Sequence, residues 1–442
     1  MADTSATEAP TVKPLAEGPR RYALTLLLVI YIFNFLDRQI VNILAEPIKI
    51  DLGLADWQLG LLTGLAFALF YTFLGLPIAR LAERADRAKI VSVAVGVWSL
   101  FTVLCGFAGN FLQLLLARIG VGVGEAGCTP PAHSLISDIT PAEKRSSAIA
   151  FYSMGIPLGS LAGMALGGLI ADSFGWRVAF FVAGAPGVIL AILAWFTLPE
   201  PRRTMPAVAK ADGPNLSGAI KELSTKSSFW WISIGAAINA MVGYGLLAFY
   251  GSFYLRNHAE GLQDLATSLG LGMGPIGFVG LALGLIIGIF GAVGTMAGGS
   301  ITDRFLKTDV RGYAFIPAVA NLLSIIPLLI AMLTGNTLIS LIALGFVTFF
   351  GSIWYGPVFA SAQGLVKPRT RATASAVLLF VINLIGLGIG PLAAGIISDV
   401  FAATYGPGDG LRFSLITIAA VGLLAVPAFL LAARTLREQI EG

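Results

Sequence analysis

Charged residues are scarce in this chain, and their scarcity excludes an ordinary soluble protein. Asp, Glu, Lys and Arg make up 12% of the 442 residues, whereas hydrophobic residues make up 56%. A soluble globular domain carries about 25% charged residues. The mean hydropathy is +0.85. The composition therefore predicts a protein integral to a membrane, with the lipid bilayer as its main surroundings.

Cysteine and histidine are also scarce, which limits the chemistry that the chain can perform. There are two Cys and two His, and Cys105 and Cys128 fall in different apolar segments. Buried thiols are therefore expected rather than a disulfide. The scattered His and Cys specify no metal site, and we find no nucleophile–base pair. The sequence predicts neither an enzyme nor a bound cofactor.

One glycine-rich run has the pattern of a nucleotide-binding motif. Residues 122–127, Gly-Val-Gly-Glu-Ala-Gly, fit G-x-G-x-x-G. That motif requires a preceding strand, and these glycines lie in the middle of an apolar segment. Small residues at this spacing instead let helices approach closely. Pro157 and Pro391 lie among similar glycines, where they either serve as hinges for gating or are accommodated by simple packing.

Apolar segments long enough to cross a bilayer recur along the whole chain. A spanning helix needs about 20 apolar residues, and a lack of period-2 alternation favours helices over strands. Twelve such segments lie near residues 23–45, 57–79, 90–108, 112–136, 148–171, 177–198, 229–253, 273–298, 312–334, 337–364, 372–397 and 411–433. The predicted fold class is therefore an all-α integral membrane protein with twelve transmembrane helices.

The basic residues predict the orientation. With both termini cytoplasmic, 22 of the 28 Lys and Arg lie on the cytoplasmic side, and the outer loops keep Lys49, Arg177, Arg256 and Arg412. This asymmetry follows the positive-inside rule. It accounts for the net charge of +4 without a nucleic-acid partner. The polar N-terminal region does not resemble a cleavable signal peptide, and we expect the protein in the inner membrane of the cell.

The second half of the chain repeats landmarks of the first. The charged loop 79–89 returns as 299–309, and Gly168-Leu-Ile-Ala-Asp172 returns as Gly395-Ile-Ile-Ser-Asp399. Duplication in a membrane protein points to transport, with the substrate site between two pseudo-symmetric bundles. We expect a monomer. Its predicted divisions are a cytoplasmic tail at 1–22, a six-helix bundle at 23–198, a linker with a short amphipathic helix at 199–228, a second six-helix bundle at 229–434 and a tail at 435–442.

Four charged side chains fall inside spanning segments of the first half. They are Asp37, Arg38, Arg118 and Glu125. Charge inside a membrane is costly, so each of them is a candidate for function. Two interpretations stay open, because these residues either line a water-filled cavity or form ion pairs that only lock helices together.

Neutral polar residues extend the same helix faces. At 100° per residue, Tyr31 and Asn34 share a stripe with Arg38, and Thr129 continues the face of Glu125. The second half offers only neutral candidates for the same cavity, among them Asn239, Tyr250 and Trp354. We therefore predict ionic chemistry in the first half and mainly shape and hydrogen bonding in the second.

The repeated charged loops suggest a gate on the inner side. Glu83-Arg84 aligns with Asp303-Arg304, and each acid lies just past an apolar segment. There it can cap the N-terminus of a helix in the opposite half. Arg87 can pair with Asp138 at the inner end of the fourth segment. Such contacts would hold the inner gate shut, unless the loops are solvated and only enforce topology.

These motifs resemble those of the major facilitator superfamily. The loop 79–89 is similar to its signature between helices two and three, and Arg118 with the following glycines is similar to its helix-four signature. Residues 155–168 resemble the helix-five signature of antiporters, although Ser160 stands where Pro is usual. The resemblance covers essentially the whole chain and implies the major facilitator fold.

Within that superfamily, two motifs resemble the spinster family of lipid transporters. They are Asn34-Phe-Leu-Asp-Arg38 and Gly122-Val-Gly-Glu-Ala126. The resemblance implies proton-coupled movement of a sphingosine-1-phosphate-like or lysophospholipid substrate. It implies that Arg38 binds the phosphate and that Asp37 and Glu125 titrate, with Arg118 as the neighbouring cation.

The leading prediction is therefore a proton-coupled secondary transporter of an amphipathic, anionic lipid. One alternative is a broad-specificity proton-coupled drug exporter, in which a carboxylate in the cavity recognises cations. Another is a membrane receptor that binds its ligand without moving it, although the short polar linker offers no appended signalling domain.

Overall fold

A computed structural model describes residues 14–204, 216–367 and 370–440 of the chain. Within these ranges every regular element is a helix, which confirms the predicted all-α fold class. The helices of the first half are α1 (Glu17–Ile43), α2 (Ala45–Leu52), α3 (Asp56–Gly60), α4 (Ala66–Arg84), α5 (Arg87–Gly106), α6 (Phe111–Glu125), α7 (Thr129–Ile139), α8 (Arg145–Ser153), α9 (Gly155–Phe174) and α10 (Trp176–Thr197).

A short helix, α11 (Leu216–Ser224), lies within the predicted linker and precedes the second half of the chain. The helices of the second half are α12 (Ser227–Asn257), α13 (Ala259–Ser268), α14 (Pro275–Leu285), α15 (Gly291–Leu306), α16 (Gly312–Leu333), α17 (Thr337–Ser352), α18 (Tyr355–Gly364), α19 (Arg371–Val381), α20 (Gly390–Gly422) and α21 (Ala425–Gln439).

Eleven helical segments of the described chain are long and apolar enough to cross a membrane, and one of them makes two crossings. That segment, Thr373–Gln439, has 67 residues. A helix of this length would measure about 100 Å, against a hydrocarbon core of about 30 Å. The chain turns back at Gly406, whose φ of 80° and ψ of 167° break the helix in a region that favours glycine. The number of crossings is therefore twelve, as predicted.

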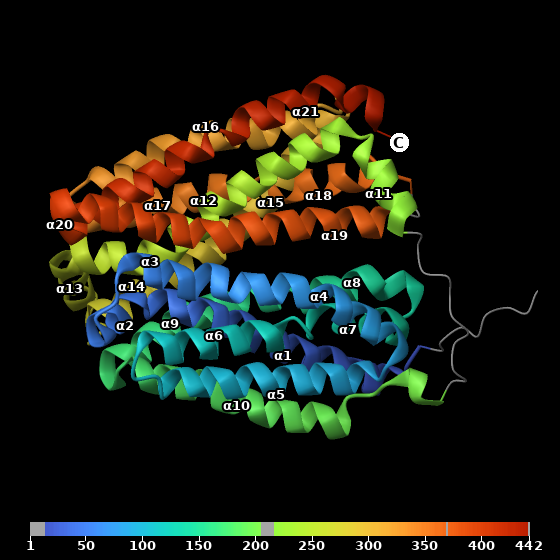
Figure 1. Ribbon diagram of the computed structural model, residues 1–442, viewed down its shortest axis with the longest axis horizontal. Coiled ribbons are helices and arrows are strands. Elements are labelled where there is room, and N and C mark those ends of the chain that lie inside the picture. The colour runs from blue at the N-terminus through green and yellow to red at the C-terminus, as the bar shows by residue number, and fades with distance from the viewer. Residues whose placement is uncertain (1–13, 205–215, 368–369, 441–442) are drawn as a thin grey trace, which may run out of the picture.

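The two halves form separate groups of long helices that lie side by side (Figure 1). We call the end at which α1 begins and α21 stops the terminal end. The opposite end, which carries α2, α13 and the turn at Gly406, is the far end (Figure 1). Three spans are interrupted by π-helical turns, one near the start of its span at Leu61–Leu65 and two closer to the middle at Ile286–Phe290 and Ile382–Ile389. Such turns are rare and are frequent at functional sites.

The halves are in close contact at the far end. A Cβ on Gly60 would lie 2.2 Å from the carbonyl oxygen of Pro391, so only glycine permits this approach of α3 to α20. Among the described residues, all hydrogen bonds and ion pairs between the halves lie at the far end. Among the described residues, the polar contacts between the halves are therefore concentrated at the far end.

Candidate functional site

The centre of the first half holds an ion pair between two spanning helices. Nε of Arg38 in α1 lies 2.5 Å from Oε2 of Glu125, the last residue of α6. The Glu125 side chain is fully buried, whereas 17% of the Arg38 side chain is exposed. The cation is thus the member of the pair that a ligand can reach.

Aromatic rings surround the exposed cation. The guanidinium carbon of Arg38 lies 5.1 Å from the ring centroid of Phe35, 4.9 Å from that of Phe67 and 4.5 Å from that of Tyr71. Ring faces attract cations at such distances. The rings therefore hold the guanidinium in place beside Glu125 and make the surroundings apolar.

A second, deeper pair lies behind the first. Nη1 of Arg118 lies 3.8 Å from Oδ2 of Asp37, and both side chains are almost completely buried. Neither carboxylate oxygen of Asp37 forms a hydrogen bond with the described protein, and the same is true of the side-chain amide of Asn34 and of Oε1 of Glu125. Buried polar atoms without partners are costly and uncommon. The cluster therefore retains capacity to bind a proton, water or a polar ligand atom.

The helix that carries Glu125 breaks immediately after it, which the sequence did not predict. α6 ends at Glu125 and α7 starts at Thr129. A Cβ on Gly124 would lie 2.5 Å from the backbone nitrogen of Trp98 in α5, and one on Gly122 would lie 2.8 Å from the carbonyl oxygen of Phe67 in α4, so these glycines serve the close packing of α6 against both helices. The break places Glu125 at a helix end inside the membrane. Tyr31, also predicted for the site, is buried and stacks on Tyr152 at 4.2 Å.

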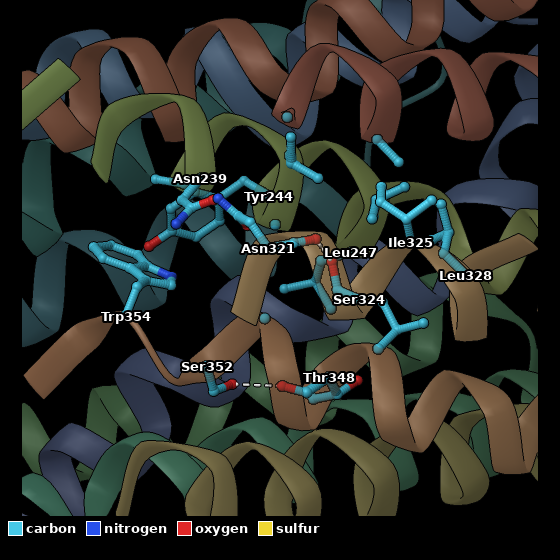
Figure 2. A pocket seen from close by; sticks show the side chains of 18 of the residues that line it. Asn239, Tyr244, Leu247, Asn321, Ser324, Ile325, Leu328, Thr348, Ser352 and Trp354 are labelled. Atoms are coloured by element: carbon cyan, nitrogen blue, oxygen red, sulfur yellow. Dashed lines mark hydrogen bonds between the residues drawn. The ribbon is translucent and has the colours of Figure 1, made fainter. Parts of the chain in front are cut away.

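The second half contains a cavity of about 190 Å³. It lies between α12, α16, α17, α18 and α20, and its lining includes the three residues predicted from this half, Asn239, Tyr250 and Trp354. Figure 2 shows the cavity from close by, with Asn239 and Trp354 labelled. Tyr244, another neutral polar residue of the predicted segment 229–253, also lines the cavity, and the structure adds Asn321, Ser324, Thr348, Ser352 and Tyr355. The added residues of α16 and α17 are neutral polar residues in mainly apolar helices, which is the only signal that could have identified them. None of the lining residues is charged, so the cavity suits an uncharged, largely apolar group.

The predicted gate residues divide into three groups. Arg87 pairs with Asp138 at 2.7 Å and also, unforeseen from the sequence, with Glu200 at 2.6 Å. Arg87 and Asp138 belong to the first half, and Glu200 lies at the start of the predicted linker, so none of these contacts reaches the second half. Asp303 and Arg304 are exposed, and the side chain of neither forms a hydrogen bond or an ion pair with another described residue. Asp303 therefore caps no described helix of the opposite half in this conformation. The side chains of Glu83 and Arg84 lie outside the part that the structure describes.

Comparison with known proteins points to one family. The model of the Major Facilitator Superfamily matches residues 27–391. An MFS-type efflux pump of Mycolicibacterium smegmatis is 33% identical over 96% of this chain and 95% of its own length. Protein spinster homolog 1 of Xenopus tropicalis is 28% identical over 93% of this chain and 80% of its own length.

A solved structure shares both the fold and much of the sequence. It is the crystal structure of a bacterial homologue of the human lysosomal transporter Spinster, in an inward-facing and unoccupied conformation. It is 32% identical to this chain and superposes with a TM-score of 0.86, covering 97% of this chain and 100% of the other.

Proposed function

Because this chain belongs to the major facilitator superfamily and is a transporter of the spinster type, we propose that its substrate is an amphipathic, anionic lipid. The lipid would be sphingosine-1-phosphate-like or a lysophospholipid, moved by alternating access and coupled to protons. The observation that carries this proposal is the ion pair of the partly exposed Arg38 with the buried Glu125.

The first step is recognition of the headgroup. A guanidinium binds phosphate or carboxylate through two parallel, charge-assisted hydrogen bonds. Arg38 donates its Nε–H to Glu125, so an anion that binds the guanidinium through both Nε and an Nη competes with Glu125. An anion that docks on Arg38 therefore draws the cation away from Glu125.

The second step is proton uptake. A buried carboxylate that loses its cation is stabilised by protonation. Substrate binding would thus favour a proton on Glu125, and Asp37, which lies beside Arg118, would supply a second carboxylate within the same cluster. Asn34, Tyr31 and Thr129 would complete the polar wall of this half.

The apolar part of the lipid would occupy the second half. The cavity beside Asn239, Tyr250 and Trp354 is uncharged and mostly apolar, which suits an acyl chain. By the positive-inside rule the terminal end would be cytoplasmic. Because the bonds between the halves lie at the far end, this conformation would open toward the cytoplasm. The protein would act as a monomer in the inner membrane of the cell.

Purified variants in liposomes test the proposal. Arg38→Ala should weaken binding of a lysophospholipid about 10- to 150-fold, the loss of a charged hydrogen bond. Glu125→Gln should bind the lipid but lose flux driven by a pH gradient, and Asp37→Asn should show an intermediate loss. The exposed Asp264→Asn is the matched control. If Glu125→Gln transports with unchanged pH dependence, proton coupling at this site is wrong.

A broad drug exporter is the second candidate, because the relative from Mycolicibacterium smegmatis is described as an efflux pump. In that case Glu125 would bind lipophilic cations, and Arg38→Ala would strengthen their binding by freeing the carboxylate. Competition between a lipophilic cation and a lysophospholipid in the same liposomes separates the two. Binding of either without flux would indicate a receptor.

A further inference from the structure

The two halves repeat a short motif in α9 and α20, near the far end of the molecule. Residues 168–172 and 395–399 each place an aspartate four positions after a glycine, so the glycine and the aspartate lie on the same face of the helix. A Cβ on Gly395 would lie 2.2 Å from the carbonyl oxygen of Asp56, and one on Gly168 would lie 2.7 Å from that of Ile276. Each glycine therefore lets a helix of the opposite half approach to backbone contact.

Each aspartate caps the helix of the opposite half that lies against the glycine of the same motif. Asp399 accepts hydrogen bonds from the backbone N–H of Asp56 at 3.0 Å and of Trp57 at 2.8 Å, where the helical span Asp56–Ala82 begins. Asp172 accepts one from the N–H of Gly274 at 2.5 Å, just before α14. The first N–H groups of a helix have no partner within it and carry the positive end of its dipole. Both caps cross from one half to the other.

The two caps differ in their surroundings. Beside Asp399, the carboxylate of Asp56 accepts hydrogen bonds from Arg256 at 2.7 Å and from the hydroxyl of Ser398 at 2.6 Å. Both donors belong to the second half, so they reinforce the same junction. Asp172 has no ion pair among the described residues. The junction at Asp399 therefore combines a cap with buried ionic bonds, whereas that at Asp172 is a cap alone.

We propose that Asp399 and Asp172 are pseudo-symmetric latches that hold the far end shut, and that the latch at Asp399 is the stronger. Opening of the far end requires α3 to leave α20 and α14 to leave α9. Both caps must then break. The first N–H groups of the helices and the two aspartate carboxylates lose their hydrogen bonds to each other and form hydrogen bonds with water instead. The inference rests on the proposed function only in that alternating access needs the far end to open.

Distances between spin labels across the far end test the latches. Labels at Ile50→Cys and Leu269→Cys occupy exposed positions, one in each half, and the buried Cys105 and Cys128 are replaced by Ala. The population with the longer distance should rise about fivefold in Asp399→Ala, the usual effect of losing one N-cap.

Matched variants accompany this measurement. Asp172→Ala should give a smaller rise than Asp399→Ala, and the double variant should give the largest. Asp264→Ala, which removes an exposed carboxylate at the same end, should leave the distance unchanged. If Asp399→Ala does not fold, Asp399→Asn keeps one acceptor oxygen and should give an intermediate rise.

Unchanged distances in the folded Asp399 variants would overturn the latches, and equal rises for both aspartates would overturn their ranking. The distances are read without substrate or pH gradient. A shift in a protein that fails to transport lipid in a separate flux assay would therefore refute the proposed function alone. Intact lipid transport without a shift would refute the latches alone.

Discussion

Replacement of Arg87 by Ala should destabilise the protein strongly. Arg87 begins α5, and its side chain is fully buried. Its Nε and Nη2 donate to the two oxygens of Glu200 at 2.9 Å and 2.6 Å, and its Nη1 donates to Asp138 at 2.7 Å. The variant leaves the carboxylate of Glu200, whose side chain is 1% exposed, without its cation.

The expected magnitude follows from this burial. Removing one partner of a buried ion pair costs about 3–5 kcal/mol, because the other charge stays desolvated. Arg177 is a matched control, since it pairs with Asp51 at 2.6 Å but the two side chains are 40% and 44% exposed. Arg177→Ala should cost only about 0.2–1 kcal/mol.

The assay is unfolding of the detergent-solubilised protein in a titration with sodium dodecyl sulfate, followed by tryptophan fluorescence. A double-mutant cycle adds Glu200→Gln to Arg87→Ala. Because the second change neutralises the stranded charge, the double variant should lose less than the sum of the single losses. The reasoning would be refuted by a loss below about 1 kcal/mol in Arg87→Ala, or by losses that add to within about 0.5 kcal/mol.

Three other perturbations have defined outcomes. Arg256→Gln leaves two carboxylates of the first half short of a cation, so it should raise far-end accessibility, measured as labelling of a cysteine introduced at Ile50. The backbone N–H of Lys367 lowers the pKa of Glu222, so the bond that attaches α11 to the second half persists at neutral pH and is lost as the pH falls through that lowered pKa. The protection of residues 216–226 against hydrogen exchange, corrected for the intrinsic pH dependence of amide exchange, should fall there in the native protein and should stay constant in Glu222→Gln. Val347→Trp fills part of the cavity of the second half and should weaken binding of long-chain lysophospholipids more than short-chain ones in a binding titration.

Much of the fold could be predicted because it depends on properties that are local in the chain. Twelve apolar segments and the repeated landmarks sufficed for two groups of six spans. The breaks inside spans were not predicted. The end of α6 at Glu125 and the π-helical turn at Leu61–Leu65 depend on packing against neighbouring helices, which segment hydropathy does not register.

The candidate site was predictable in kind but not in its connections. The cost of charge in a bilayer singles out Arg38 and Glu125 from the sequence alone. Their contact joins residues 87 positions apart, and only the tertiary arrangement of α1 and α6 decides it. The neutral lining at Asn321 and Ser324 was missed, because such residues carry no desolvation cost large enough to mark them in a sequence.

The sequence by itself determined that this chain crosses a membrane twelve times in two related halves, because hydrophobic transfer and segment length act along the chain without reference to partners. Only the tertiary structure decided which groups meet across the halves. Arg256 reaches Glu46 over 210 positions, and Asp399 reaches Asp56 over 343. Such contacts depend on distances of a few ångströms between helices that the sequence places far apart, and those distances are set by the packing of the whole bundle.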